Sequence, residues 1–208
     1  MSASTSALQQ KNAKHLIQSF SDLSYIKNPE STHIISRADG VYIYDNDGKK
    51  ILDSMSGLWC VNMGYGQQSI IEAVNEQMKE LVYYNNFFGS SHPSAIRLSE
   101  MIADKTPEGM NKIYFCGSGS EANDTVVRLA RHYWAARGNK SKSVIISRTN
   151  AYHGSTMAGA SLGGMSAMHA QGGLPIADIE HIDQPYYYDA CVEAGGKIDA
   201  DEFGLKMA

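Results

Sequence analysis

Four small residues, Gly117-Ser118-Gly119-Ser120, follow an apolar run that ends at Cys116, and a helical pattern starts directly after them. Small residues let backbone N–H groups approach an anion closely. A helix N-terminus adds unpaired N–H donors and partial positive charge, and the serine hydroxyls are further donors. The stretch predicts an anion cradle at the start of a helix, with simple helix capping as the alternative interpretation.

Two common phosphate-binding motifs match this stretch incompletely. No Gly-Lys-Ser/Thr follows, so it is not a Walker A loop. Gly117 and Gly119 form G-x-G, and Ala122, a permitted variant, stands where a dinucleotide fingerprint has its third glycine. The acidic residue expected about 20 positions further on is not evident. A Rossmann-type nucleotide-binding protein is therefore a remote alternative.

Tyr152 and His153 follow a β-branched run, residues 143–147, which predicts a buried strand. In open α/β sheets, ligands bind outside the carboxyl ends of the strands. An aromatic side chain at that place could stack on a planar ring. A purely structural role for this pair stays open.

Aromatic side chains also occur in two segments that read as loops, with Trp59 in "GLWC" and Phe87 and Phe88 in "NNFFGS". Aromatic residues in loops often line apolar pockets. A small satellite core is the alternative interpretation.

The elements that must position these residues alternate along the chain. Asp45-Asn46-Asp47-Gly48 predicts the turn of a hairpin over 41–52, and the polar residues 1–9 are expected to fray. Apolar spacing and β-branched runs predict the remaining elements: helices over 70–82, from Pro93 to before Pro107, over 120–137 and over 155–164, strands over 112–116 and 143–147, and a last helix capped by Asp199 and Glu202. Strands that alternate with helices imply crossovers and a largely parallel sheet, hence an α/β fold.

Composition narrows the classes of function. The 208 residues carry a net charge of −4, which argues against a nucleic-acid or membrane-surface partner. No apolar stretch approaches the roughly 20 residues of a membrane span. The cysteines, Cys60, Cys116 and Cys191, are odd in number and unpatterned, so we expect a cytoplasmic protein without a disulfide framework or metal site.

Four blocks together resemble one family: "LDSMSGLWCVNMGYG", "YFCGSGSEAND", "AYHGST" and "GLPIADIEHIDQPYYY". They are similar to the class III pyridoxal-phosphate-dependent aminotransferases, with the ω-amino acid and amine:pyruvate branch fitting best. The resemblance runs from about residue 12 to the end, in the family's order and spacing. It implies transfer of an amino group from an amine or ω-amino acid to a keto acid such as pyruvate.

The resemblance also implies the architecture. The chain would have the α/β fold type I of pyridoxal-phosphate-dependent transferases, as an N-terminal segment plus part of the large parallel-sheet domain. Residues 1–60 would form an arm and part of the small domain, and residues 61–208 an incomplete large cofactor-binding domain. Family members of this kind are homodimers with active sites at the subunit interface.

By their places in the family's motifs, two groups of residues acquire roles. Those expected to bind pyridoxal 5′-phosphate are Ser118, Gly119 and Ser120 at the phosphate, with Tyr152 stacked on the ring and His153 in the same wall. Those expected to line the substrate pocket are Trp59, Phe87 and, with a weaker match, Phe20.

The same resemblance implies that two catalytic parts lie downstream of residue 208. One is the lysine that forms a Schiff base with the cofactor aldehyde and carries the proton, and the other is the aspartate that pairs with the pyridinium nitrogen. No lysine of this chain is at a family-matching position, so we expect the 208 residues to be the N-terminal portion of a transaminase and inactive alone. An aminomutase, a racemase, a decarboxylating transaminase or an inactive fragment remains the alternative.

Overall fold

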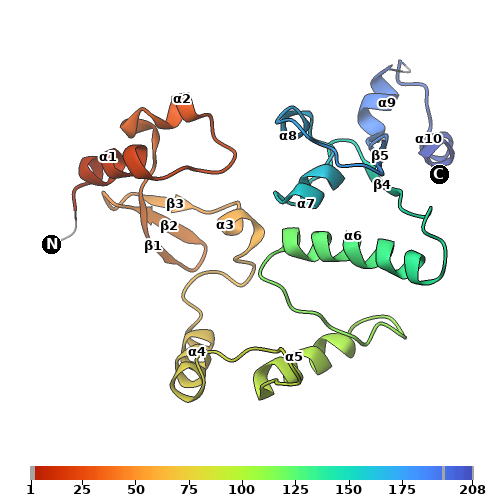
Figure 1. The fold of residues 1–208 in the computed structure, drawn as a ribbon. Coiled ribbons are helices and arrows are strands. Elements are labelled where there is room, and N and C mark those ends of the chain that lie inside the picture. The colour runs from red at the N-terminus through yellow and green to blue at the C-terminus, as the bar shows by residue number, and fades with distance from the viewer. Residues whose placement is uncertain (1–2, 194, 208) are drawn as a thin grey trace. The chain divides into compact units, whose positions relative to one another are not determined.

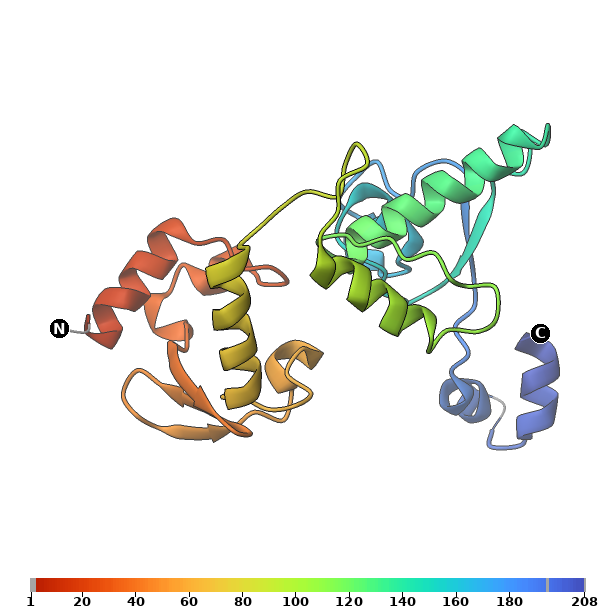
Figure 2. The ribbon, with the colours of Figure 1, turned by 90° about the horizontal axis from the view of Figure 1, so that it is seen from below.

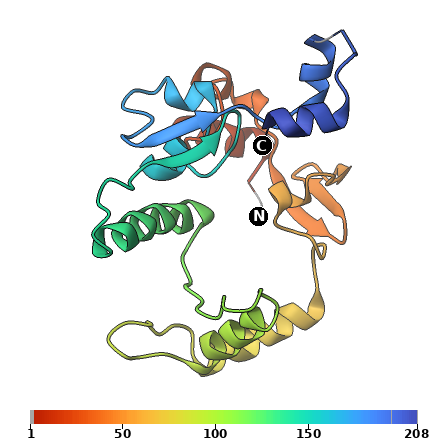
Figure 3. The ribbon, with the colours of Figure 1, turned by 90° about the vertical axis from the view of Figure 1, so that its right-hand side faces the viewer.

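The computed structural model describes residues 3–193 and 195–207. The chain divides into two compact units, Met1–Arg97 and Leu98–Ala208, and each is described by itself. Figures 1, 2 and 3 show the elements of both units from three directions. The sequence-based boundary at residue 60 stays a prediction.

The first unit is built on a three-stranded antiparallel sheet (Figure 1). Its strands are β1 (Ile35–Asp39), β2 (Tyr42–Asp45) and β3 (Lys50–Leu52), in the order β1-β2-β3. Ile43 pairs with Ile51 across the expected hairpin. Gly48 closes the turn with a φ of 87°, and the Asp45 carboxylate accepts hydrogen bonds from two backbone N–H groups of that turn. The hairpin predicted from the Asp-Asn-Asp-Gly turn is therefore confirmed.

Helix α1 (Thr5–His15) corrects the expectation that the polar N-terminal residues fray. The Ser4 hydroxyl caps the helix by accepting a hydrogen bond from the N–H of Ala7 at 3.3 Å. The amide side chains of Gln9 and Asn12 donate to the backbone oxygen and hydroxyl of Thr32, at 2.9 and 3.1 Å. Polar side chains hold this helix in place, so the polar character of its first residues did not mean that they fray.

The other helices of the first unit are short, except for α4. They are α2 (Leu23–Ile26), the 3₁₀ turn η1 (Pro29–Ser31), α3 (Ser56–Trp59) and α4 (Gln68–Glu80); α5 (Pro93–Ala103) crosses the division between the units. The apolar spacing that predicted α4 is confirmed. Its apolar stripe, Ile70, Val74 and Met78, is about half exposed to solvent.

The second unit pairs a parallel two-stranded sheet with helices. Strand β4 (Ile145–Arg148) runs parallel to β5 (Ile179–Ile182), with Ile145 opposite Ile179, and Figure 3 shows the two arrows side by side. The helices are α6 (Gly119–Ala136), α7 (Met157–Leu162), α8 (Ser166–His169), α9 (Tyr187–Glu193) and α10 (Ala200–Met207). This parallel α/β arrangement matches part of the expected fold.

The buried apolar residues of the second unit lie between α6, α7, α8 and the parallel strands. They are Val127, Ala160, Met168 and Ile179. Ser161 is fully buried beside them. Its hydroxyl donates to the backbone oxygen of Met157 and accepts from the N–H of Ile176, so burial of this polar group leaves no unsatisfied hydroxyl.

The strand expected over residues 112–116 is wrong. This segment has no regular secondary structure. An extended segment becomes a strand only when a neighbour pairs with its backbone, and no described segment does so here. The Ser/Gly turn therefore follows an unpaired segment.

The last helix agrees with its capping pattern. The Asp199 carboxylate accepts a hydrogen bond from the N–H of Glu202 at 2.7 Å. Within the part of the chain that the structure describes, none of the helices combines the length and the apolar character that crossing a membrane requires.

Candidate functional site

The N-terminus of α6 has the geometry of an anion cradle. Ser118 is the N-cap, with an extended backbone, and its hydroxyl accepts a hydrogen bond from the N–H of Glu121 at 3.2 Å. The Glu121 carboxylate turns back and accepts from the N–H of Gly117 at 2.6 Å. This reciprocal pair resembles a capping box and fixes the chain's entry into the helix.

Two backbone N–H groups at this end of the helix have no acceptor among the described residues. Across residues 3–193 and 195–207, no group accepts a hydrogen bond from the N–H of Gly119 or of Ser120. A Cβ atom built on Gly119 would meet nothing within 4 Å. The first turn of an 18-residue helix therefore offers two N–H groups, and the positive end of its dipole, to open space.

The predicted aromatic loop lies against this helix end. The Asn123 side-chain amide donates to the backbone oxygen of His153 at 2.6 Å. The Ser120 hydroxyl accepts from the N–H of Ser155 at 3.1 Å. Two blocks that are about thirty residues apart in the sequence are thus joined by hydrogen bonds, as expected if they form one site.

A glycine makes that close approach possible. Gly154 is buried, with a φ of 131°. A Cβ atom there would lie 2.6 Å from the Ser120 hydroxyl oxygen and 2.9 Å from the Ser120 Cα. Any larger residue would push the loop away from the helix, so the glycine of "AYHGST" is a packing requirement.

Sequence reasoning missed Asp124, which completes the contact. Its carboxylate accepts from the Thr156 hydroxyl at 2.6 Å and from the N–H of Gly159, at the start of α7, at 3.1 Å. Asp124 stands four residues after Ser120, on the same face of α6. That spacing, a polar residue one turn beyond the cradle, was the available signal.

Tyr152 and His153 lie close to the cradle along the chain, and His153 is tied to α6 through its backbone. The Tyr152 side chain is 54% exposed. The structure therefore brings Ser118, Gly119, Ser120 and the loop that carries both residues into one region. The stacking role of Tyr152 stays a prediction.

The predicted pocket aromatics belong to the first unit. Phe20, Trp59 and Phe87 are 70%, 79% and 65% exposed. Phe20 and Trp59 have left-handed backbones, with φ of 52° and 66°. The Phe87 N–H donates to the Asn85 side chain at 2.9 Å. Their place in a shared substrate pocket stays a prediction.

The segment that carries Trp59 is one turn of left-handed helix. The φ angles of Ser56, Gly57, Leu58 and Trp59 are all positive, between 48° and 69°. The N–H of Trp59 donates to the Met55 oxygen at 2.8 Å, which closes the turn. The sequence led us to expect an irregular loop here.

An aspartate and a tyrosine hold this turn. Asp53 Oδ2 accepts from the N–H of Gly57 at 2.8 Å and from the Tyr65 hydroxyl at 2.7 Å. The bond from Tyr65 holds the pKa of the Asp53 carboxyl below its usual value, with the Gly57 N–H acting in the same direction and partial desolvation opposing both. The same bond raises the pKa of the Tyr65 phenol.

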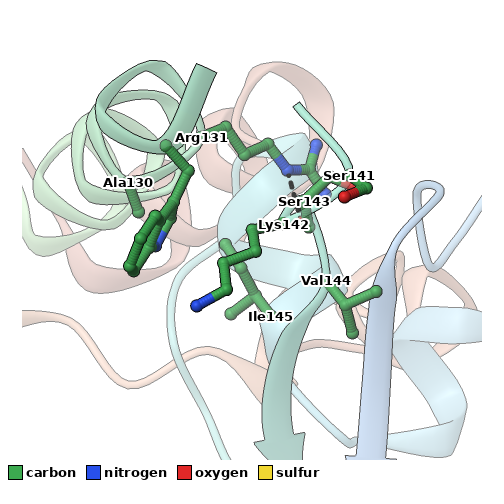
Figure 4. A pocket seen from close by; sticks show the side chains of 8 residues that line it. Ala130, Arg131, Ser141, Lys142, Ser143, Val144 and Ile145 are labelled. Atoms are coloured by element: carbon green, nitrogen blue, oxygen red, sulfur yellow. Dashed lines mark hydrogen bonds between the residues drawn. The ribbon is translucent and has the colours of Figure 1, made fainter. Parts of the chain in front are cut away.

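A hollow at the other end of α6 is a separate feature (Figure 4). It is lined by Arg131, Trp134, Lys142 and their neighbours up to Ile145. The Lys142 ammonium lies 3.9 Å from the centroid of the Trp134 ring, and Arg131 Nε donates to the Ser143 oxygen at 3.0 Å. These side chains contact the ring and backbone beside them, at the end of α6 that carries the negative pole of its dipole.

The described part of the chain contains no cluster of side chains suited to binding a metal ion. Among those residues, no group of three or more His, Cys, Asp or Glu side chains could hold a metal ion. The donors at the start of α6 are backbone N–H groups and a serine hydroxyl, which are groups that can bind an anion.

Comparison with known proteins gives a consistent result. The family model for class III aminotransferases matches residues 25–201. The putrescine–pyruvate aminotransferase of Pseudomonas aeruginosa is 51% identical over 206 residues, which are 99% of this chain and 44% of that protein. The diaminobutyrate–2-oxoglutarate transaminase of Halomonas elongata is 39% identical over 81% of this chain and 36% of its own length. This chain thus spans less than half the length of these curated relatives.

Solved structures agree. An (S)-enantioselective omega-transaminase from Thermomicrobium roseum is 30% identical, with a TM-score of 0.90 over 99% of this chain and 44% of that one. An omega transaminase variant engineered for the synthesis of bulky amines is 32% identical, with a TM-score of 0.90 over 96% of this chain and 43% of its own. With the family model spanning residues 25–201, these matches show that the chain belongs to the class III aminotransferases, whose cofactor is pyridoxal 5′-phosphate.

Proposed function

We propose that the protein is a transaminase that moves an amino group from an amine or ω-amino acid to a keto acid such as pyruvate. The observation that carries the proposal is the free pair of N–H groups at Gly119 and Ser120, in a chain of this family. The relative from Pseudomonas aeruginosa, by its name, uses putrescine and pyruvate, which supports an amine donor and pyruvate as acceptor.

The second unit fits the phosphate of pyridoxal 5′-phosphate. The open space above Gly119 leaves room for a phosphate group beside the two free N–H donors. The Ser120 hydroxyl accepts from Ser155 and retains its own proton for donation. Neutral donors and a helix dipole suit a dianion without a lysine or arginine in the cradle.

When bound, pyridoxal 5′-phosphate supplies an electron sink for the carbanion that forms at the substrate carbon. The chain's own residues would hold and orient it. Ser118, Gly119 and Ser120 would anchor the phosphate, Tyr152 would cover one face of the ring, and His153 would lie in the same wall.

The remaining assignments belong to the same proposal. Residues 61–208 would be part of the large cofactor-binding domain, and residues 1–60 an arm with part of the small domain. The whole protein would act as a cytoplasmic homodimer, with its Schiff-base lysine outside these 208 residues.

The substrate pocket is proposed to include Trp59, Phe87 and Phe20. The engineered transaminase for bulky amines has a tryptophan and a phenylalanine replaced, 28 positions apart. Trp59 and Phe87 have the same separation of 28 positions. This agreement in residue types and spacing supports a role for both in setting the size of the amine.

The test measures binding first and activity second. Pyridoxal 5′-phosphate is titrated by equilibrium dialysis, with inorganic phosphate as competitor, against the chain and its Gly119→Ala variant. We expect binding that phosphate displaces and that the variant weakens. In the whole protein, putrescine and pyruvate should yield alanine. Equal binding by both chains, or no alanine, contradicts the proposal.

A further inference from the structure

The left-handed turn Ser56–Trp59 requires an external restraint. Left-handed helical backbone costs about 1–2 kcal/mol for each residue other than glycine, and three of the four residues here are not glycine. Strain of this kind persists only where the surrounding structure over-determines it. The question is which contacts do so.

Within the first unit, packing of the Trp59 side chain does not stabilise the left-handed turn. The Trp59 side chain is 79% exposed, and Leu58 before it is 64% exposed. The backbone therefore sets the direction of the Trp59 Cα–Cβ bond, from which the indole extends. That backbone is tied to Asp53 at two points, because the Gly57 N–H donates to the Asp53 carboxylate at 2.8 Å and the Ser56 N–H donates to the Asp53 backbone oxygen at 3.3 Å.

Asp53 and Tyr65 are both anchored on the sheet. Asp53 directly follows β3, and its N–H donates to the Val41 oxygen at 3.0 Å. Tyr65 forms an isolated antiparallel bridge with Gly40, in which each residue donates to the other. Their side chains meet at 2.7 Å. The sheet thus presents one carboxylate oxygen, oriented by a phenol, to the strained turn.

Gly57 allows this contact for two reasons. Its φ is 58°, which glycine adopts without a steric penalty. A Cβ atom there would lie 2.8 Å from the Val61 side chain and 3.1 Å from the Tyr65 hydroxyl oxygen. The glycine therefore lets the phenol, the carboxylate and the turn come together.

We propose that Asp53 and Tyr65 form a latch on this turn and act as positioning residues that orient Trp59 toward the amine. The inference rests on the proposed function, because it takes Trp59 to line the substrate pocket. Neither latch residue needs to touch the substrate. Their effect is on how firmly the indole is held, and hence on the size of amine that the pocket accepts.

The first test follows the tryptophan directly. In a Trp134→Phe background, Trp59 is the single tryptophan of these 208 residues, and its fluorescence anisotropy in this chain reports its mobility. Asp53→Ala should lower the anisotropy most, Tyr65→Phe less, and Asp53→Asn least because the amide oxygen still accepts the Gly57 N–H. An unchanged anisotropy in Asp53→Ala overturns the latch, whatever the enzyme's activity.

Matched controls lie on the same sheet. Tyr44→Phe removes a phenol that, among the described residues, forms no hydrogen bond, and it keeps the ring that stacks under Arg37. Asp39→Asn removes a strand carboxylate that accepts none within the described chain. Both should leave the anisotropy of Trp59 unchanged. A drop of equal size in either control would make the effect a general loosening of the sheet and overturn the latch.

The second test reads selectivity in the whole protein. The ratio of kcat/KM for benzylamine to that for propylamine should rise about 10-fold in Tyr65→Phe, because a loosened indole admits the larger amine. A fall in anisotropy with an unchanged ratio overturns the positioning role. A fall in anisotropy in a protein that does not bind pyridoxal 5′-phosphate supports the latch and contradicts only the proposed function.

Discussion

The cradle at the start of α6 and the turn that carries Trp59 are held in opposite ways. At the cradle, Ser120, Asn123 and Asp124 lie within about one turn of the same helix, and each forms a hydrogen bond with the 153–159 segment. The tryptophan turn is a strained backbone that meets the side chains of its own sheet through one carboxylate oxygen. The proposed anion site is thus held by several side chains of one helix, whereas the proposed pocket wall depends on one aspartate, whose carboxylate and backbone oxygens accept from Gly57 and Ser56.

We expect the largest effect on stability and binding from Gly154→Ala, because Gly154 makes the closest contact between the loop and the cradle. The added Cβ would overlap Ser120, so we expect a loss of about 3 kcal/mol in the free energy of unfolding. The affinity for pyridoxal 5′-phosphate should fall about 100-fold as the loop separates from the helix. Urea unfolding and equilibrium dialysis measure the two quantities.

Gly119→Ala is the matched control for that change. Its Cβ would meet no protein atom within 4 Å, so the free energy of unfolding should not fall, while phosphate affinity drops because the methyl group occupies the open space. If Gly154→Ala has the same unfolding free energy and the same affinity for pyridoxal 5′-phosphate as the unmodified chain, contact with the loop does not hold the cradle. The contrast between the cradle and the tryptophan turn would then be wrong.

Asp124→Ala should have the next largest effect. It leaves the Thr156 hydroxyl and the buried Gly159 N–H without their carboxylate partner, at a cost of about 2 kcal/mol in the free energy of unfolding. Asp124→Asn keeps an acceptor oxygen and should lose less. Thermal unfolding measures both variants. An equal loss in the two would show that charge, rather than the acceptor, holds α7 to α6.

Ser118→Ala sharpens the distinction between capping and anion binding. Removal of the N-cap hydroxyl should lower the free energy of unfolding by about 1 kcal/mol. Ser118→Asp keeps the cap but places a negative charge beside the proposed phosphate. In urea unfolding, Ser118→Asp should therefore have a free energy of unfolding close to that of the unmodified chain. Equilibrium dialysis should show weaker phosphate binding. Unchanged binding in Ser118→Asp would reduce this residue to a cap.

The smallest effect concerns the pH dependence of the tryptophan turn. The folded-state pKa of Asp53 is lowered below its ordinary value of 3.8. Its contribution to stability is therefore complete above that value and is lost as the pH falls through the lower, folded-state pKa. In the Trp134→Phe background, the anisotropy of Trp59 should stay constant down to about pH 4 and fall only below it. A change centred near neutral pH would contradict the assignment to Asp53.

Several elements followed from local patterns alone. The apolar spacing over 70–82 became α4, the small residues before 120 became the start of α6, and the Asp-Gly turn became the β2–β3 hairpin. The Asp199 cap behaved likewise. In each case the information lies within a few residues, because helix faces, caps and tight turns are decided by neighbouring side chains and backbone.

Other features depended on residues far apart in the sequence. Segment 112–116 pairs with no other segment of the described chain, and polar side chains hold α1 against Thr32. Asp124 and Gly154 matter because the chain path brings their segments together, and Asp53 matters because Tyr65 returns to the same sheet. Periodicity reports which face of an element is apolar, but a hydrogen bond between distant residues exists only once the fold has placed its donor and acceptor within reach.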